Sequence, residues 1–301
     1  MRKPLISVVL CTYNCDKFIS DAIDSILTQT YDNFEFIIWD DGSTDNTRNV
    51  IMSYKDKRIR YVYHENTGLG MALRLACFEA KGDYIARMDS DDISLPNRFE
   101  KEVAYLEAHR DCVLVSSAVS YIDENGRSYG RSFPYTNDKI IKRHLLKANN
   151  LIVHPMAMIR REAYVAAGGY LPIRINEDSL FWSRLAKHGK IYNIPSVLGQ
   201  YRVLPSSLDH SFNPYKPVLK EFLMKMINDE QILDTDIEQY NQLFIYSKGQ
   251  VSNKEKGSKE NKKNADAEVF LYRIISPILG VNASEKLISK LKEQIYKATH
   301  R

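Results

Sequence analysis

Cysteine is scarce in this sequence of 301 residues. The four cysteines, Cys11, Cys15, Cys77 and Cys112, form no Cys-x-x-Cys pair and are too few for a disulfide framework in a chain of this length. We therefore expect reduced thiols and a cytoplasmic protein.

Long hydrophobic runs are also missing. No stretch approaches about 20 consecutive apolar residues, so no transmembrane helix is expected. The apolar segment LISVVLC near the start is short and leads into Asn14, Asp16 and Lys17 without a cleavage site of small residues. It predicts a first strand rather than a signal peptide.

The chain has no strong excess of either charge. It carries 42 basic and 38 acidic residues, for a net charge of +4, which does not indicate nucleic-acid binding. The hydrophobic share of 44% and the charged share of 27% are ordinary for a folded enzyme-sized protein. We therefore expect a folded enzyme-sized protein that does not bind nucleic acid.

Strand-like and helix-like segments alternate along the first hundred residues. LISVVL, FEFIIW, IRYVY and YIARM have the composition of strands, and segments with apolar residues at helical spacing lie between them. Ser43 is expected to be the N-cap of a helix in STDNTRNVIMSY, and KIYNIP and VLGQYRV are expected to be closing strands. Such alternation predicts an α/β fold with a mostly parallel sheet covered by helices on both faces. Ligands of such sheets bind beyond the carboxyl ends of the strands.

Acidic residues cluster where two of these strands end. Asp40 and Asp41 follow FEFIIW, and Asp89, Asp91 and Asp92 follow YIARM. Crowded carboxylates repel one another, and hard cations such as Mg²⁺ or Mn²⁺ prefer oxygen ligands, so the second cluster predicts a cation site. The alternative is a helix N-terminus near Pro96 decorated with acids, which the helix dipole favours.

Five segments occur in a characteristic order: VVLCTYNCDKFISDAIDSILTQTY, WDDGSTDNT, ENTGLGMALRLAC, MDSDD and INEDSLFWSRL. In this order they resemble the inverting family 2 glycosyltransferases, over about residues 5–203. The resemblance implies a Rossmann-like GT-A fold and a nucleotide-diphosphate sugar donor. The Gln-x-x-Arg-Trp motif of membrane-embedded polysaccharide synthases is absent, so processive synthesis is not expected.

The resemblance also implies which residues contact the donor: Thr12, Tyr13, Asn14, Asp40, Asp41, Asn66, Gly68, Asp89 and Ser90. Chemically, an aromatic ring can stack on a base, and a carboxylate can accept from ring N–H or sugar hydroxyl groups. The alternative is that Tyr13 is a strand-end aromatic and that Asp40 or Asp41 caps the helix after Gly42.

In the same family Asp91 would bind the divalent cation, Mn²⁺ or Mg²⁺, whereas Asp92 could simply cap the next helix. Asp178 would be the general base for the acceptor hydroxyl, and Glu177 would bind the acceptor or position the base. Two carboxylates in different environments allow such a division of labour. The alternative is that Glu177 and Asp178 only cap an amphipathic helix.

The implied reaction is metal-dependent, inverting transfer from a UDP-sugar to a hydroxyl of a glycan or lipid-linked oligosaccharide in cell-surface polysaccharide synthesis. The rival hypothesis is a non-catalytic subunit that binds a nucleotide sugar or assists assembly. Metal-dependent UDP binding without turnover would favour the rival.

The sequence divides into regions of different composition. We expect a glycosyltransferase domain at 1–210, with the nucleotide-sugar half at about 1–95 and the acceptor half at about 96–210, and a helical extension at 211–247. Residues 248–268 have the composition of a flexible polar linker. Residues 269–301 predict a basic amphipathic helical tail, which could contact the inner face of the cytoplasmic membrane or pack on protein.

Overall fold

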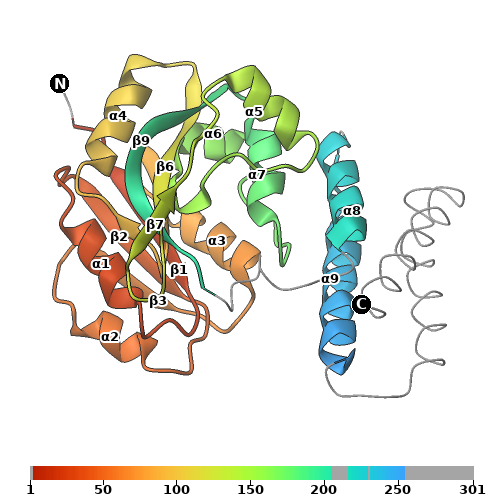
Figure 1. Cartoon of the computed structure of the whole chain (residues 1–301), viewed down its shortest axis with the longest axis horizontal. Coiled ribbons are helices and arrows are strands. Elements are labelled where there is room, and N and C mark those ends of the chain that lie inside the picture. The colour runs from red at the N-terminus through yellow and green to blue at the C-terminus, as the bar shows by residue number, and fades with distance from the viewer. Residues whose placement is uncertain (1–2, 205–215, 230, 255–301) are drawn as a thin grey trace, which may run out of the picture. The chain divides into compact units, whose positions relative to one another are not determined.

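A computed structural model of the protein describes residues 3–204, 216–229 and 231–254 (Figure 1). The chain divides into two units, one of Met1–Pro172 with Asn176–Ser207 and one of Ile173–Ile175 with Leu208–Arg301. The first unit contains the sheet, and the described part of the second contains two helices.

The strands are β1 (Ile6–Thr12), β2 (Phe34–Asp40), β3 (Ile59–Tyr63), β4 (Tyr84–Asp89), β5 (Ile93–Ser94), β6 (Cys112–Ile122), β7 (Ser128–Arg131), β8 (Met158–Arg160) and β9 (Lys190–Arg202). The helices of the first unit are α1 (Ile19–Leu27), α2 (Thr47–Ser53), α3 (Leu69–Phe78), α4 (Arg98–Ala108), α5 (Asp138–Leu145), α6 (Arg161–Ala166) and α7 (Glu177–Leu185), with a 3₁₀ helix η1 (His154–Met156). The helices of the second unit are α8 (Lys216–Asn228) and α9 (Asp234–Lys254).

The strands form one sheet in the order β3-β2-β1-β4-β8-β6-β9-β5, with β7 paired to β6. The neighbours from β3 to β4 are all parallel, and β6 is parallel to β9. Because β8 is antiparallel to both β4 and β6, these last two strands point the same way. Only the short strands β5, β7 and β8 run against the rest of the described sheet, so the predicted mostly parallel α/β sheet is confirmed.

Helices cover both faces of this sheet, because successive strand residues point to opposite sides. Val8 and Leu10 of β1 pack with α1, α2 and α4, whereas Val9 and Cys11 pack with α3, α5, α6 and α7. Figure 1 shows α1, α2 and α4 around one side of the strands and α3, α6 and α7 around another. The parallel half thereby presents its strand ends, and the loops after them, at one edge.

Several local expectations differ from the structure. KIYNIP and VLGQYRV form one continuous strand, β9, which pairs with β6 in an irregular register. Ser43 was expected to begin a helix, but α2 begins at Thr47 after Asn46. Ser43 is occupied otherwise: its N–H donates to Asp40 Oδ1 at 2.8 Å, and its hydroxyl accepts from the N–H of Asn14 at 3.0 Å.

The helical extension predicted after the sheet domain is present as α8 and α9. Phe222 and Tyr240 pack edge to face across these helices, with ring centroids 5.7 Å apart. Helix α9 continues to Lys254, past the expected start of the linker at 248. The rest of the predicted linker and the tail at 269–301 lie outside the described residues.

All four cysteines are free thiols, as expected from their spacing. Among the residues that the structure describes, no helix is long and apolar enough to cross a membrane.

Candidate active site

The predicted donor residues lie at one edge of the sheet because three neighbouring parallel strands end there. Thr12, the last residue of β1, is in register with Asp40 at the end of β2. On the other side of β1, Cys11 is in register with Asp89 at the end of β4. The carboxyl ends of β2, β1 and β4 thus bring the two acidic clusters to the same edge.

Asp40 and Asp41 are buried and already bonded within the protein. Asp40 Oδ1 accepts from the N–H of Ser43, and Oδ2 accepts from the Tyr61 hydroxyl, both at 2.8 Å. Asp41 accepts from the N–H and hydroxyl of Thr67 at 3.0 Å and from the N–H of Gly68 at 2.9 Å. Asp41 therefore fixes the loop that leads into α3, and neither Asp40 nor Asp41 caps α2, whose N-cap is Asn46. Each oxygen keeps a second lone pair for a ligand.

The loops around Asp40 and Asp41 contain glycines with positive φ angles. Gly42 has φ +84°, and a Cβ there would lie 2.8 Å from the backbone nitrogen of Asn66. Asn66 in turn donates from its side chain to the carbonyl of Asp41 at 2.9 Å. Gly68, with φ +86°, precedes α3. Asn66 and Gly68 therefore lie beside Asp41, and their role toward a donor stays a prediction.

The loop after β1 offers an exposed ring and a buried hydroxyl. Tyr13 is 53% exposed, so its face is accessible to a base. Thr12 is buried, and its Oγ1 accepts from and donates to no described residue. The Asn14 side chain accepts from the N–H of Thr44 at 2.8 Å and fixes this loop against the one after β2.

Unlike Asp40 and Asp41, the cluster after β4 is electrostatically unsatisfied. Burial and the charge of Asp89 raise the pKa of Asp91 to about 6. Burial and both neighbouring carboxylates hold the pKa of Asp92 well above its usual range. Asp92 Oδ1 accepts from the N–H of Arg202 at 2.7 Å, while its buried Oδ2 has no partner among the described residues. Asp92 therefore anchors β9 and does not cap α4, which begins at Arg98.

This crowding is what a divalent cation would relieve, because a hard cation favours ionised carboxylate oxygens. Asp91, with its raised pKa, and the unbonded oxygen of Asp92 fit such a group. Within the described part of the chain no three His, Cys, Asp or Glu side chains form a ready-made metal cluster. Magnesium-type sites commonly use only one or two carboxylates, and substrate phosphates complete the coordination.

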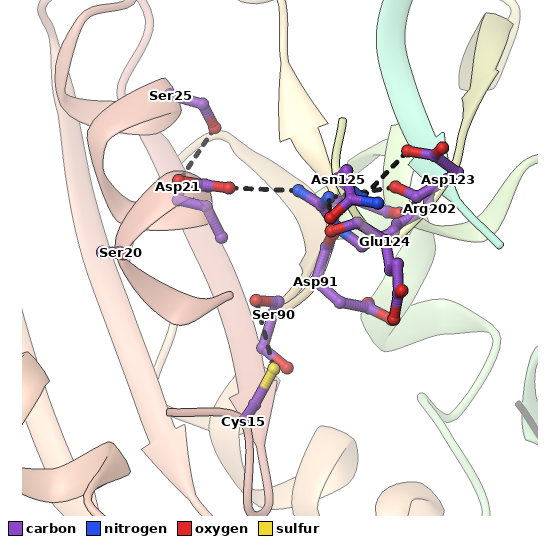
Figure 2. A network of polar contacts seen from close by, with 12 residues as sticks. Cys15, Ser20, Asp21, Ser25, Ser90, Asp91, Asp123, Glu124, Asn125 and Arg202 are labelled. Carbon is purple, nitrogen blue, oxygen red and sulfur yellow. Dashed lines mark hydrogen bonds and ion pairs between the residues drawn. The ribbon is translucent and has the colours of Figure 1, made fainter. Parts of the chain in front are cut away.

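Arg202, the last residue of β9, holds the loop that carries Asp91 (Figure 2). Its Nε donates to the Asp91 carbonyl at 2.8 Å, and its Nη2 pairs with Asp21 of α1 at 3.1 Å. Nη1 donates to the carbonyls of Asp123 and Glu124 in the turn between β6 and β7. Figure 2 shows this network and, below Asp91, the separate contact in which Cys15 donates to the carbonyl of Ser90.

The second acidic pair opens α7. Glu177 is 7% exposed, and burial together with the charge of Asp178 raises the pKa of Glu177 to about 8. Asp178 accepts from the side chain of Asn150 at 2.6 Å and from the N–H of Ser179 at 2.6 Å. Burial therefore favours a proton on Glu177, beside Asp178, which is oriented by donors; acid and base roles are assigned from such differences in environment.

The two acidic sites are close enough to interact. Asp89 is among the charges that raise the pKa of Glu177, and Arg87, which pairs with Asp89 at 2.5 Å, also acts on Glu177. By contrast, a cavity of about 340 Å³ lies at the other end of β4, lined by Tyr84, Glu107 and Arg161 among others. It is separate from the acidic edge.

Sequence reasoning assigned no role to the basic and amide side chains that organise these acids: Arg87, Asn150, His154 and Arg202. Arg87 directly precedes the acidic motif, and its place inside a strand was the available signal. Asn150 and Arg202 lie far along the chain from their partners, at separations of 28 and 111 residues. No local pattern marks such contacts.

The family is defined by comparison with known proteins. Residues 7–166 match the model of glycosyl transferase family 2. EpsE of Bacillus subtilis (strain 168) is 34% identical over 207 residues, which cover 66% of this chain and 73% of EpsE. The O-antigen biosynthesis glycosyltransferase WbnJ of Escherichia coli is 32% identical over 231 residues, covering 73% and 90%. The chain belongs to glycosyltransferase family 2 and is a transferase enzyme.

The fold agrees with this assignment. The structure of S. aureus TarS in complex with UDP-GlcNAc superimposes with a TM-score of 0.65 at 17% identity, over 91% of this chain and 81% of that chain. The mannosyltransferase PcManGT from Pyrobaculum calidifontis, in complex with GDP-Man and Mn²⁺, gives 0.59 at 16% identity, over 99% and 87%. The sheet domain therefore has the GT-A fold, as the sequence resemblance implied.

Proposed function

We propose that this glycosyltransferase moves a sugar from a nucleotide-diphosphate donor, a UDP-sugar, to a hydroxyl of a glycan or lipid-linked oligosaccharide, with inversion and with a divalent cation. The observation that carries the proposal is the pairing of two acidic sites. In one, burial and neighbouring carboxylates raise the pKa values of Asp91 and Asp92, and in the other a carboxyl of raised pKa, Glu177, adjoins Asp178, which is oriented by donors.

On the donor side, Tyr13 is accessible for stacking on the base, and Asp40 and Asp41 provide acceptor oxygens beside it. Thr12, Asn14, Asn66, Gly68, Asp89 and Ser90 complete the proposed donor contacts. Asp91 would hold Mn²⁺ or Mg²⁺, with Asp92 in support. When bound, the cation would neutralise charge that develops on the leaving diphosphate.

On the acceptor side, Asp178 removes the proton from the attacking hydroxyl. Asn150 holds one carboxylate oxygen, and the N–H of Ser179 holds the other, so the base is fixed in orientation. Glu177 is too buried to offer much surface to an acceptor. We therefore favour positioning of the base, of the two roles expected for it. The single displacement turns an α-linked donor into a β-linked product.

A role in cell-surface polysaccharide synthesis is supported by the names of relatives, since WbnJ is named for O-antigen biosynthesis and AmsE of Erwinia amylovora for amylovoran biosynthesis. AmsE is 29% identical over 204 residues. Such an acceptor, if lipid-linked, suits a cytoplasmic enzyme at the inner membrane face. Contact through residues 269–301 rests on the sequence alone.

The proposal is tested with a panel of UDP-, GDP- and dTDP-sugars in Mn²⁺ or Mg²⁺, by release of nucleoside diphosphate. We expect one UDP-sugar to be turned over, and EDTA to abolish this turnover. Proton NMR should show a β-linked product from an α-linked donor. Asp178→Asn should lower kcat about 100-fold or more. The matched control, Glu162→Gln at an exposed position of α6, should stay within about twofold.

Two results would contradict the proposal. UDP binding that needs the cation, with no turnover of any donor, would favour the non-catalytic binding subunit. An α-product from an α-donor would exclude the single displacement and with it the role of Asp178.

A further inference from the structure

The two acidic sites are joined through the interior of the protein by one chain of polar side chains. Arg87 of β4 is completely buried on the side of the sheet that carries α7. Its Nη2 donates to Asp89 at 2.5 Å, and its Nε donates to His154 Nε2 at 3.0 Å. On the far side of the imidazole, His154 Nδ1 lies 3.9 Å from Glu177 Oε1.

The rest of the Arg87 guanidinium is fixed by the sheet. Nη1 donates to the carbonyls of Val9 at 2.9 Å and Met88 at 3.0 Å. A guanidinium held by strand carbonyls on one side presents its remaining N–H groups in a rigid geometry. Arg87 is therefore a fixed positive charge between the donor edge and the acceptor acids.

This arrangement determines the proton on His154. Arginine can only donate, so Nε2 of His154 must accept from it, and the remaining ring proton is assigned to Nδ1, which faces Glu177. Burial and the Arg87 charge hold the pKa of His154 well below its usual range, so the ring stays neutral. The Tyr170 hydroxyl contacts Nε2 at 2.9 Å, and Trp182 packs edge to face on the ring.

We propose that Arg87 and His154 are positioning residues, which hold the donor-side Asp89 and the acceptor-side Glu177 in a fixed arrangement through this buried chain of contacts. The proposal rests on the proposed function, because it assigns the two ends to donor and acceptor. His154 keeps its N–H toward Glu177, 3.9 Å away, and Glu177 occupies the first turn of α7 together with Asp178. Neither Arg87 nor His154 touches the reacting atoms.

A different buried arginine provides the comparison. Arg160 of β8 is 7% exposed and donates to the carbonyls of Cys112 and Leu106 and to the Tyr84 hydroxyl. Tyr84 begins β4, whereas Asp89 ends it, so Arg160 lies at the opposite end of the strand. Like Arg87, Arg160 is a buried arginine that donates to backbone carbonyls, but it does not connect the two acidic sites.

Replacement of His154 separates the two contacts of its ring. In His154→Gln the amide oxygen can take the place of Nε2 and accept from Arg87, but no N–H remains at the position of Nδ1, whereas His154→Ala removes both. With the UDP-sugar that wild type turns over, we expect kcat to fall about 10-fold in His154→Gln and about 100-fold in His154→Ala. The donor KM should change less than about threefold in both. Arg160→Lys should lower Tm while leaving kcat unchanged.

A second measurement needs no substrate. Nitrogen-15 NMR of histidine-labelled protein should show His154 neutral and protonated on Nδ1 between pH 6 and 8. In Arg87→Lys we expect a mixture of the two neutral tautomers. A charged His154, or a proton on Nε2, would overturn the proposal, as would a His154→Gln kcat within twofold of wild type. If wild type turns over no donor, the proposed function fails, and the NMR result still decides whether the chain of contacts exists.

Discussion

Two pairs of adjacent aspartates follow parallel strands at the same edge of this sheet, and their surroundings are opposite. Asp40 and Asp41 have each carboxylate oxygen bonded to a protein donor. Asp91 and Asp92 have raised pKa values, and one buried oxygen of Asp92 has no described partner. The first pair organises loops, whereas the second is arranged for a positive ligand. Position at a strand end therefore does not by itself show how far a carboxylate is already satisfied by donors of the protein.

The comparison predicts its largest effect on activity at Asp91. Asp91→Asn keeps the side-chain volume and removes the charge, so turnover of the UDP-sugar should fall about 1,000-fold. Stability without metal should not fall, because a repelling charge is gone. Steady-state kinetics and denaturant unfolding measure the two quantities. Glu124→Gln in the adjacent turn is the control, and near-normal turnover in Asp91→Asn would remove the distinction between the pairs.

The next effect concerns Glu177 and pH. Its pKa of about 8 lies above the ordinary value of 4.5, so the folded state keeps a proton that the unfolded state releases. Stability from this group is complete below about pH 4.5 and is lost as pH rises toward 8. Glu177→Gln has no such loss, so its unfolding free energy relative to wild type should rise by about 3 kcal/mol between pH 5 and 7.5. Denaturant unfolding without metal measures it, and a pH-independent difference would contradict it.

The bonded pair predicts a loss of stability instead. Asp41→Asn places an amide where Asp41 accepts from Thr67 and Gly68, so one oxygen acceptor is lost at the start of α3. We expect the free energy of unfolding to fall by about 2 kcal/mol. Asp16→Asn, at an exposed position in a neighbouring loop, is the control. An unchanged denaturation midpoint for Asp41→Asn would mean that its bonds contribute little.

The smallest effect is expected at Arg202. Arg202→Lys keeps the charge but cannot reproduce the fork that reaches Asp91, Asp21 and the turn after β6. Calorimetry should show Mn²⁺-dependent UDP binding weakened about tenfold, because the loop carrying Asp91 is held less firmly. Exposed Arg131→Lys serves as the control. Equal affinities of wild type and Arg202→Lys would show that the loop is fixed by other contacts.

Much of the fold could be predicted because its signals are local. Short segments of strand-like composition predicted β1, β2 and β4, and the acids after them were found from their order in the chain. The family motifs likewise come from short segments. Ser43 shows the limit: a good capping residue is bonded to Asp40 and Asn14 instead, and α2 begins four residues later.

The sequence by itself determined that parallel strands would bring acidic residues to one edge, because strand period and chain order are properties of neighbouring residues. Only the tertiary structure decided which acids are bonded, which are crowded, and that Arg87 meets His154 across 67 residues of sequence. These properties depend on burial and on donors from distant segments. Hydrogen bonds and desolvation act between atoms that folding brings together, so no local pattern can specify them.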